Sequence, residues 1–170
     1  MGEPYYIRVP ETGKIIARHE GMDFCGLAGV DVLSPASGVI VDIVEDDPYR
    51  GGSVTLQTSI TYDHYETGNL TYKLFVQALH IMPNKNLMVG SKVNAGDVIG
   101  RIQPPNRPEI GSRPHVHLAA GAGPDVWNLH TDPNQFWQKG PGRVSCYNPS
   151  DPPSERHLVA PIRCFLANKK

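Results

Sequence analysis

The chain has 170 residues, a formal net charge of −1 and only 19% charged residues, so it lacks the cationic excess that nucleic-acid binding by bulk charge requires. Its 17 glycines and 16 prolines interrupt regular structure too often for a long helical bundle or a coiled coil. Full disorder is excluded because apolar β-branched and aromatic residues recur in short blocks and the net charge is almost zero. A chain of this length can bury roughly 70% of its extended surface, so we expect one domain spanning residues 1–170.

The start of the chain and its hydropathy argue against a membrane protein. No stretch approaches the ~20 apolar residues that cross a bilayer, so no membrane span is expected. The N-terminal sequence, Met1 to Tyr6, has neither the basic start nor the apolar stretch of a signal peptide. The sequence therefore predicts a cytosolic protein, or an exported one whose export signal is absent from this chain.

Short blocks rich in β-branched and aromatic residues predict strands, and the glycines and asparagines between them predict turns. The spacing of these blocks indicates an antiparallel all-β fold. In chain order the predicted strands are 37–44, 53–60, 70–80, 97–102 and 115–120.

Helical signals are nearly absent from the sequence. One short helix is expected over 132–137, with Asp132 as its N-cap and proline at the first helical position. Residues 103–114 contain four prolines and predict a loop. Because glycine and proline recur from residue 121 onward, we expect 121–170 to be a loop-rich C-terminal extension of the same domain.

The three cysteines allow one disulfide and one free thiol, and none of them forms the C-x-x-C pair of a thiolate metal site or a redox motif. We favour a disulfide between Cys146 and Cys164, because a covalent link would stabilise the loop-rich extension. Three reduced, buried thiols are the alternative. A disulfide favours an oxidising, extracytoplasmic location, either periplasmic or secreted. Cys25 is expected to pack as a small apolar residue.

Five of the residues that could bind a metal fall into a suggestive pattern. His19 and Asp23 belong to the segment H-E-G-M-D, His80 ends the longest predicted strand, and His115 and His117 form H-V-H in another. Side chains at i and i+2 of a strand point to the same face, so the last two imidazoles project together. Histidine and carboxylate are the ligands that zinc prefers when one coordination position stays open to water.

Each motif alone has a simpler interpretation. A single strand histidine is more often a surface residue or a hydrogen-bonded core residue than a metal ligand. Gly21, however, lets the backbone between His19 and Asp23 fold tightly, so that the carboxylate can reach the same ion as the H-V-H pair. Taken together, the motifs predict a metal site.

The same motifs resemble the signature of the LytM/lysostaphin-type zinc metallopeptidases, which cut the peptides of peptidoglycan. H-E-G-M-D-F at 19–24 resembles H-x-G-x-D-[FIL], and R-P-H-V-H-L at 113–118 resembles x-P-H-L-H-F. Three further segments match in order: V-L-S-P-A-S-G-V at 32–39, A-L-H at 78–80 and V-G-S-K-V-N-A-G-D-V-I-G at 89–100. The resemblance covers a core of about 19–118. It implies an antiparallel β-sandwich, or barrel-sandwich hybrid (duplicated hybrid motif), with a loop-walled groove and very little helix.

The resemblance also implies roles for the five residues. His19, Asp23 and His117 would be the ligands of one Zn²⁺, and His80 and His115 would be the catalytic pair beside it. The implied reaction is hydrolysis of peptide cross-links of peptidoglycan by a metal-activated water. One histidine of the pair would take the water's proton and the other would hydrogen-bond the oxyanion, and the sequence does not say which does which.

Two other classes of function would share part of this pattern. A non-catalytic binding or regulatory protein on the same fold would typically lack a ligand or a catalytic histidine, and none is missing here. A lipoyl or biotinyl module, or a phosphocarrier, would share the V-x-x-G-D-x-I-G rhythm, but Lys92 lacks the neighbouring Met or Asp of a modified lysine.

We therefore expect a peptidoglycan peptide as substrate, no nucleic-acid partner and a monomer. The bond cut, Gly-Gly or D-Ala to a diamino acid, stays open. Three histidines match no family position and are expected at the surface: His64, His130 and His157.

Overall fold

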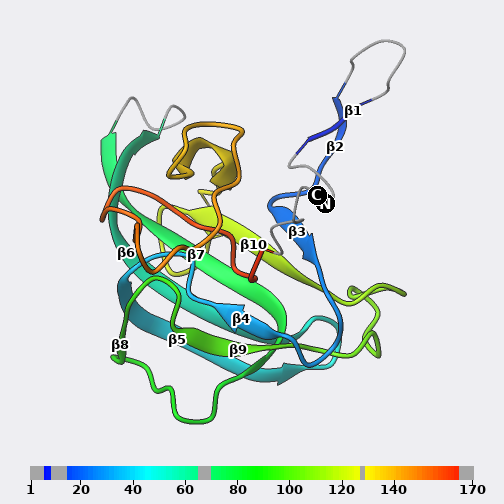
Figure 1. Cartoon of the computed structure of the whole chain (residues 1–170). Coiled ribbons are helices and arrows are strands. Elements are labelled where there is room, and N and C mark those ends of the chain that lie inside the picture. The colour runs from blue at the N-terminus through cyan, green and yellow to red at the C-terminus, as the bar shows by residue number, and fades with distance from the viewer. Residues whose placement is uncertain (1–5, 9–14, 65–69, 127–128, 165–170) are drawn as a thin grey trace, which may run out of the picture.

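The structure is a computed structural model that describes residues 6–8, 15–64, 70–126 and 129–164, and within these residues the chain is built from antiparallel strands (Figure 1). This confirms the predicted all-β fold. The strands are β1 (Tyr6–Arg8), β2 (Ile15–Arg18), β3 (Met22–Cys25), β4 (Asp31–Leu33), β5 (Gly38–Asp47), β6 (Gly51–His64), β7 (Leu70–Pro83), β8 (Lys92–Val93), β9 (Val98–Ile102) and β10 (His115–Gly121).

An eight-stranded sheet forms the body of the domain, and β1 pairs with β2 in a separate hairpin. The strand order along the sheet is β3-β10-β7-β6-β5-β8, and β9 pairs with both β7 and β4. The long strands β6 and β7 lie at the centre of this order. β3 and β10 are therefore direct neighbours, although they lie near opposite ends of the segment 19–118 (Figure 1).

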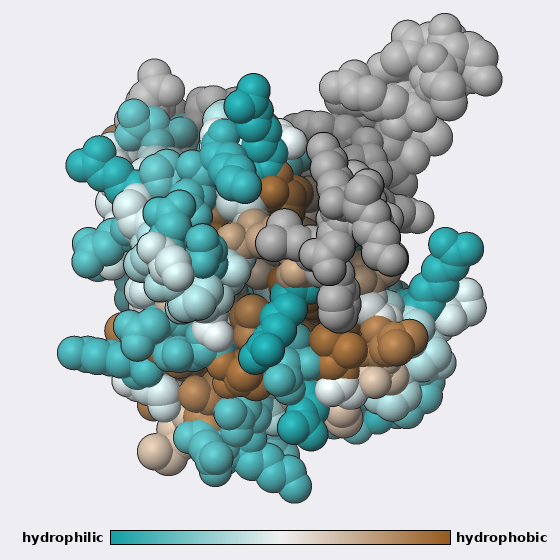
Figure 2. All heavy atoms as spheres, in the orientation of Figure 1, coloured by the Kyte–Doolittle hydropathy of each residue, from teal (hydrophilic) through white to brown (hydrophobic). Residues whose placement is uncertain are grey.

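The main hydrophobic core joins the β4–β9 pair to the central strands of the same sheet. Val32 of β4 and Ile99 of β9 belong to one buried cluster with Ile40, Leu56 and Val76 of the central strands. Burial of these aliphatic side chains is the main force that folds the sheet back on itself. The face shown in Figure 2 carries hydrophilic side chains around its outline and hydrophobic ones grouped nearer its middle.

The second face of β10 and β7 carries histidine side chains. In β10, Val116 and Leu118 point into the main core, so the alternation of a strand directs His115 and His117 to the opposite side. Leu79 lies beside His117 on this same side because the two residues are register partners. We call this side of the sheet the histidine face.

The predicted short helix is present as the 3₁₀ helix η2 (Pro133–Phe136). Asp132 is its N-cap, and the carboxylate accepts a hydrogen bond from the backbone N–H of Asn134 at 2.9 Å. Phe136 is buried and Trp137 is fully buried in the main core, which anchors the extension to the sheet.

The predicted disulfide is also present, between Cys146 and Cys164. The prediction that Cys25 packs as an apolar residue is wrong, since this thiol is free and exposed. Strand alternation explains the error: Phe24 points into the core, so its neighbour in β3 points outward. In the described part of the chain, no helix has the length and apolar character that crossing a membrane requires.

Candidate metal centre

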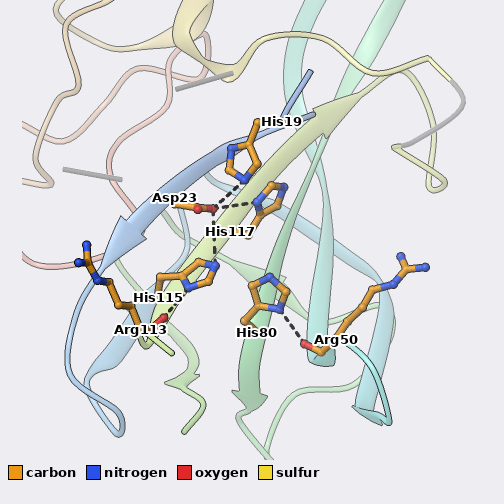
Figure 3. Close-up of polar contacts among 7 residues, drawn as sticks. All are labelled: His19, Asp23, Arg50, His80, Arg113, His115 and His117. Atoms are coloured by element: carbon orange, nitrogen blue, oxygen red, sulfur yellow. Dashed lines mark hydrogen bonds and ion pairs between the residues drawn. The ribbon is translucent and has the colours of Figure 1, made fainter. Parts of the chain in front are cut away.

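Three side chains converge at the β3 edge of the histidine face (Figure 3). Asp23 and His117 are register partners on β3 and β10, and His117 Nδ1 lies 2.9 Å from Asp23 Oδ1. His19 approaches from the segment before β3 and places Nε2 3.4 Å from the same oxygen. Ligand atoms of all three residues lie within 4.8 Å of one another. Donors held at ~2.1 Å from a tetrahedral zinc lie about 3.4 Å apart, so this spacing suits a single ion.

A glycine makes this convergence sterically feasible. A Cβ on Gly21 would lie 2.3 Å from His117 Nε2 and 2.7 Å from the carbonyl oxygen of Leu118. The bend before it includes Glu20 at φ +57°, in the left-handed region. Gly21, the central glycine of H-E-G-M-D, therefore lets the chain turn tightly and brings His19 against the imidazole of His117. This cradle and the His, Asp, His donor set both fit a zinc ion.

The carboxylate at the centre is held in its charged form. Burial alone would raise the pKa of Asp23, but the hydrogen bond from His117 and the electrostatic attraction of His115, His117 and His19 outweigh it. The pKa of this carboxyl accordingly lies below its ordinary value. An ionised carboxylate is the form that binds a metal.

Two further imidazoles, His80 and His115, stand next to these three residues (Figure 3). The ring centroids of His80 and His115 are 4.8 Å apart, and His80 lies 6.0 Å from the ring of His117. His115 Nε2 is 3.7 Å from Asp23 Oδ1, so this imidazole directly borders the candidate metal ligands.

Backbone carbonyls fix the orientation of both additional imidazoles. His80 Nδ1 lies 2.7 Å from the carbonyl oxygen of Arg50, and His115 Nδ1 lies 2.8 Å from that of Arg113. A carbonyl oxygen can only accept, so each Nδ1 carries the proton and donates it. The remaining nitrogen, Nε2, is then a free base in the neutral ring. Burial lowers the pKa of His80 to about 4, which keeps this ring neutral near pH 7.

The structure thus brings together all five residues that the sequence predicted for the site. Sequence reasoning did not identify the carbonyl groups of Arg50 and Arg113, because a backbone group leaves no signal in the residue type. The interpretation of His64 as a surface residue is wrong, since it is 1% exposed. Its ring packs between Tyr62 and Tyr72, at centroid distances of 6.0 Å and 6.3 Å.

The two remaining histidines lie apart from this site and are half-buried rather than fully exposed. The carbonyl oxygen of His130 lies 3.4 Å from His64 Nε2, and His157 Nδ1 lies 2.8 Å from Ser154 Oγ. Neither residue belongs to the group that could hold a metal.

The fold and the five side chains define an all-β protein with a candidate metal centre of the hydrolase type on one face of its sheet. The chain belongs to peptidase family M23, whose family model matches residues 17–125. This match confirms the resemblance on which the sequence interpretation rests. No curated protein sequence matches the chain.

Solved structures share the fold at low sequence identity. The catalytic domain of lysostaphin, an antimicrobial peptidase from Staphylococcus simulans, is 22% identical with a TM-score of 0.52; the match covers 78% of this chain and 86% of that one. The catalytic domain of the prophage-encoded M23 protein EnpA from Enterococcus faecalis, solved as a mutant, is 19% identical with a TM-score of 0.56, covering 76% and 85%. LytU is 19% identical with a TM-score of 0.53, covering 78% and 79%.

Proposed function

We propose that this chain is a zinc-dependent endopeptidase that hydrolyses the peptide cross-links of bacterial peptidoglycan. The observation that carries the proposal is the convergence of His19, Asp23 and His117, with two imidazoles beside them whose Nδ1 atoms lie within hydrogen-bond distance of backbone carbonyl oxygens. Membership of peptidase family M23 supports the reaction class. The likeness to the antimicrobial peptidase lysostaphin agrees with a cell-wall substrate.

In this proposal His19, Asp23 and His117 hold one zinc ion. Zinc supplies a Lewis acid and lowers the pKa of a bound water to about 7. The chain's own contribution is to present Asp23 ionised and His117 with Nδ1 turned toward it. These two residues lie on paired strands of a sheet, which holds them in a fixed relationship.

His80 and His115 are the proposed catalytic residues. Each has its Nδ1–H tied to a backbone carbonyl, so each can accept a proton at Nε2 and return it to a leaving amine. Once protonated, the same nitrogen becomes a donor that can stabilise a negatively charged oxygen. With a pKa of about 4, His80 is a weak base near pH 7 and holds a proton only transiently.

We also propose one metallopeptidase domain over residues 1–170, acting as a monomer outside the cytoplasm. The buried Trp137 joins the extension to the main core, and the Cys146–Cys164 disulfide favours an oxidising compartment. The second candidate, a non-catalytic binding protein on the same fold, is less well supported, because the described residues retain every proposed ligand and catalytic side chain.

Mass spectrometry of muropeptides tests the proposal. Purified peptidoglycan of several cross-link chemistries is digested with the zinc-loaded protein, with and without a chelator. We expect new cleaved peptides that disappear with the chelator, and the new termini identify the bond. Products that persist with the chelator would rule out the zinc mechanism, and binding without products would favour the non-catalytic candidate.

A further inference from the structure

A hollow on the histidine face lies beside the proposed catalytic pair. It has a volume of about 210 Å³, and its lining includes Asp47, Arg50, Ser53, Gln77 and Leu79. Arg50 links the hollow to the proposed catalytic pair, because its carbonyl oxygen accepts the hydrogen bond from His80 Nδ1.

Strand register gives the position of the hollow relative to the metal centre. Asp23, His117, Leu79 and Ser53 form one row across β3, β10, β7 and β6, because each is the register partner of the next. Gln77 lies in the adjacent row, two residues further along β7. From strand spacing and rise, its Cα is roughly 8 Å from that of His117. An extended peptide spans that distance in two to three residues.

Gln77 has an unused hydrogen-bonding atom. The residue is only 9% exposed, and its Nε2 donates to Thr55 Oγ1 at 3.0 Å and to Ser53 Oγ at 3.4 Å. Its Oε1 is buried and has no hydrogen-bond partner among the described residues. A buried amide oxygen without a partner costs free energy, so its retention at the edge of a binding face points to a ligand donor.

The lining of the hollow also includes an acidic and a basic residue, Asp47 and Arg50. Asp47 Oδ1 accepts the backbone N–H groups of Tyr49 and Arg50 at 2.8 Å and 2.9 Å, which fixes the carboxylate at the wall. The guanidinium of Arg50 extends away from the histidines (Figure 3) and pairs with Glu109 at 3.6 Å. The hollow is smaller than the ~300 Å³ at which ligand pockets begin, so it suits one amino-acid residue rather than a sugar chain.

We propose that this hollow is a substrate subsite in which Gln77 Oε1 accepts an N–H group of the peptide, two to three residues from the bond that is cut. The inference rests on the proposed function, since it assigns part of the same substrate. The N–H group has two sources, a backbone amide of the peptide or the ammonium of a diamino-acid side chain. Gln77 is thus a specificity-determining residue for the peptide.

Calorimetric titration of the chelated protein with soluble muropeptides tests the subsite without turnover. Gln77→Leu should weaken binding about tenfold, because the acceptor is lost and the side chain keeps a similar size. Gln77→Glu should retain binding, because a carboxylate still accepts an N–H. Gln57→Leu is the matched control: it is a glutamine on the same side of β6, opposite Phe75 and one row beyond Gln77, and it should bind as the wild type does.

Muropeptides with acetylated amines separate the two sources. Binding that survives acetylation identifies a backbone amide, and binding that is lost identifies the ammonium. Three outcomes would overturn the subsite. They are wild-type affinity in a folded Gln77→Leu protein, loss of affinity in the Gln77→Glu protein, and failure of the wild type to bind muropeptides. Cleavage of peptidoglycan with no effect of Gln77 leaves the proposed function standing and removes this inference. Binding that depends on Gln77 without cleavage supports the binding subsite and removes the proposed endopeptidase function.

Discussion

His117 and Asp23 face each other across the β10–β3 pair, with His117 Nδ1 2.9 Å from Asp23 Oδ1, although 94 residues separate them in the chain. The register of one strand pair therefore assembles two of the three candidate metal ligands. A slip of one residue would turn the side chains of either strand to the opposite face and dismantle the site. Sheet folding and metal binding are thus coupled at these two strands.

Substitution of His117 and of His115 should separate metal binding from catalysis. His117→Ala removes a ligand, so the protein should lose its zinc. His115→Ala removes a neighbouring base, so it should keep zinc and lose roughly 100-fold or more in turnover. Elemental analysis and digestion of peptidoglycan measure the two effects. Equal loss of zinc in both variants would show that His115 is itself a ligand and would overturn the assignment.

Gly21→Ala should damage the metal centre without touching a ligand. The added Cβ would lie 2.3 Å from His117 Nε2 and 2.7 Å from the Leu118 carbonyl oxygen, so the imidazole or the backbone must shift. Displacement of a ligand's surroundings typically costs about 10–100-fold in metal affinity. Competition with a chromogenic chelator measures that affinity. Gly123→Ala is the control, because nothing lies within 4 Å of its new Cβ. Equal affinities in the two variants would show that the close approach at Gly21 does not matter for metal binding.

The sequence was sufficient to predict the candidate ligands and the neighbouring His115, because H-E-G-M-D and H-V-H are local patterns whose spacing survives in the fold. The short strand β3 was not among the predicted strands, since Asp23 interrupts the apolar pattern that marks a strand. Without this strand, the sequence offers no alternation that would place Cys25 on an exposed side. Had the strand been recognised, alternation would have placed Cys25 beside Asp23 on the outer side, opposite buried Phe24.

Contacts through space explain what the sequence could not predict. His64 follows an aspartate at the end of a strand, which is typical of a surface residue, yet it is buried between two tyrosines. The carbonyl oxygen of His130, from the C-terminal extension, lies 3.4 Å from its Nε2. The carbonyl of Arg50 is a similar case, because only the folded hairpin brings it to His80.

Gly51→Ala should lower turnover by misplacing that carbonyl. Gly51 has φ +76°, and an added Cβ would lie 2.0 Å from Gln103 Oε1, which also accepts the N–H of Gly52. Movement of the hairpin would carry the carbonyl of Arg50 away from His80, so kcat should fall with little change in zinc content. Gly90→Ala shares the positive φ, at +91°, but meets nothing within 4 Å. If both variants lose kcat equally, backbone strain and not the Gln103 contact is responsible.

Removal of the disulfide should destabilise the domain and spare the metal centre. Cys146 and Cys164 are 18 residues apart, and closure of a loop of that length stabilises a protein by about 3 kcal/mol. Both cysteines lie outside the strands that carry the proposed ligands. The double variant with serine at both positions should therefore show a lower midpoint in urea but bind zinc as tightly as the wild type. A weaker zinc affinity would show that the extension supports the site directly.

Asp132→Asn should make the stability of the domain less dependent on pH. Burial raises the pKa of Asp132, and the hydrogen bond from the Asn134 N–H offsets this only in part. A carboxyl whose folded pKa exceeds its unfolded value favours the folded state most at low pH. That contribution is lost as the pH rises through the folded pKa, and the charged group then costs stability at neutral pH.

Asparagine keeps an oxygen that can cap η2 but carries no charge. The variant should therefore equal or exceed the wild type in stability at pH 7 and lose that advantage near pH 3. Urea unfolding of both proteins at the two pH values, with a chelator present, measures the difference. A larger advantage at pH 3 than at pH 7 would mean that the ionised carboxylate stabilises the cap, and that the sign of the burial effect is reversed.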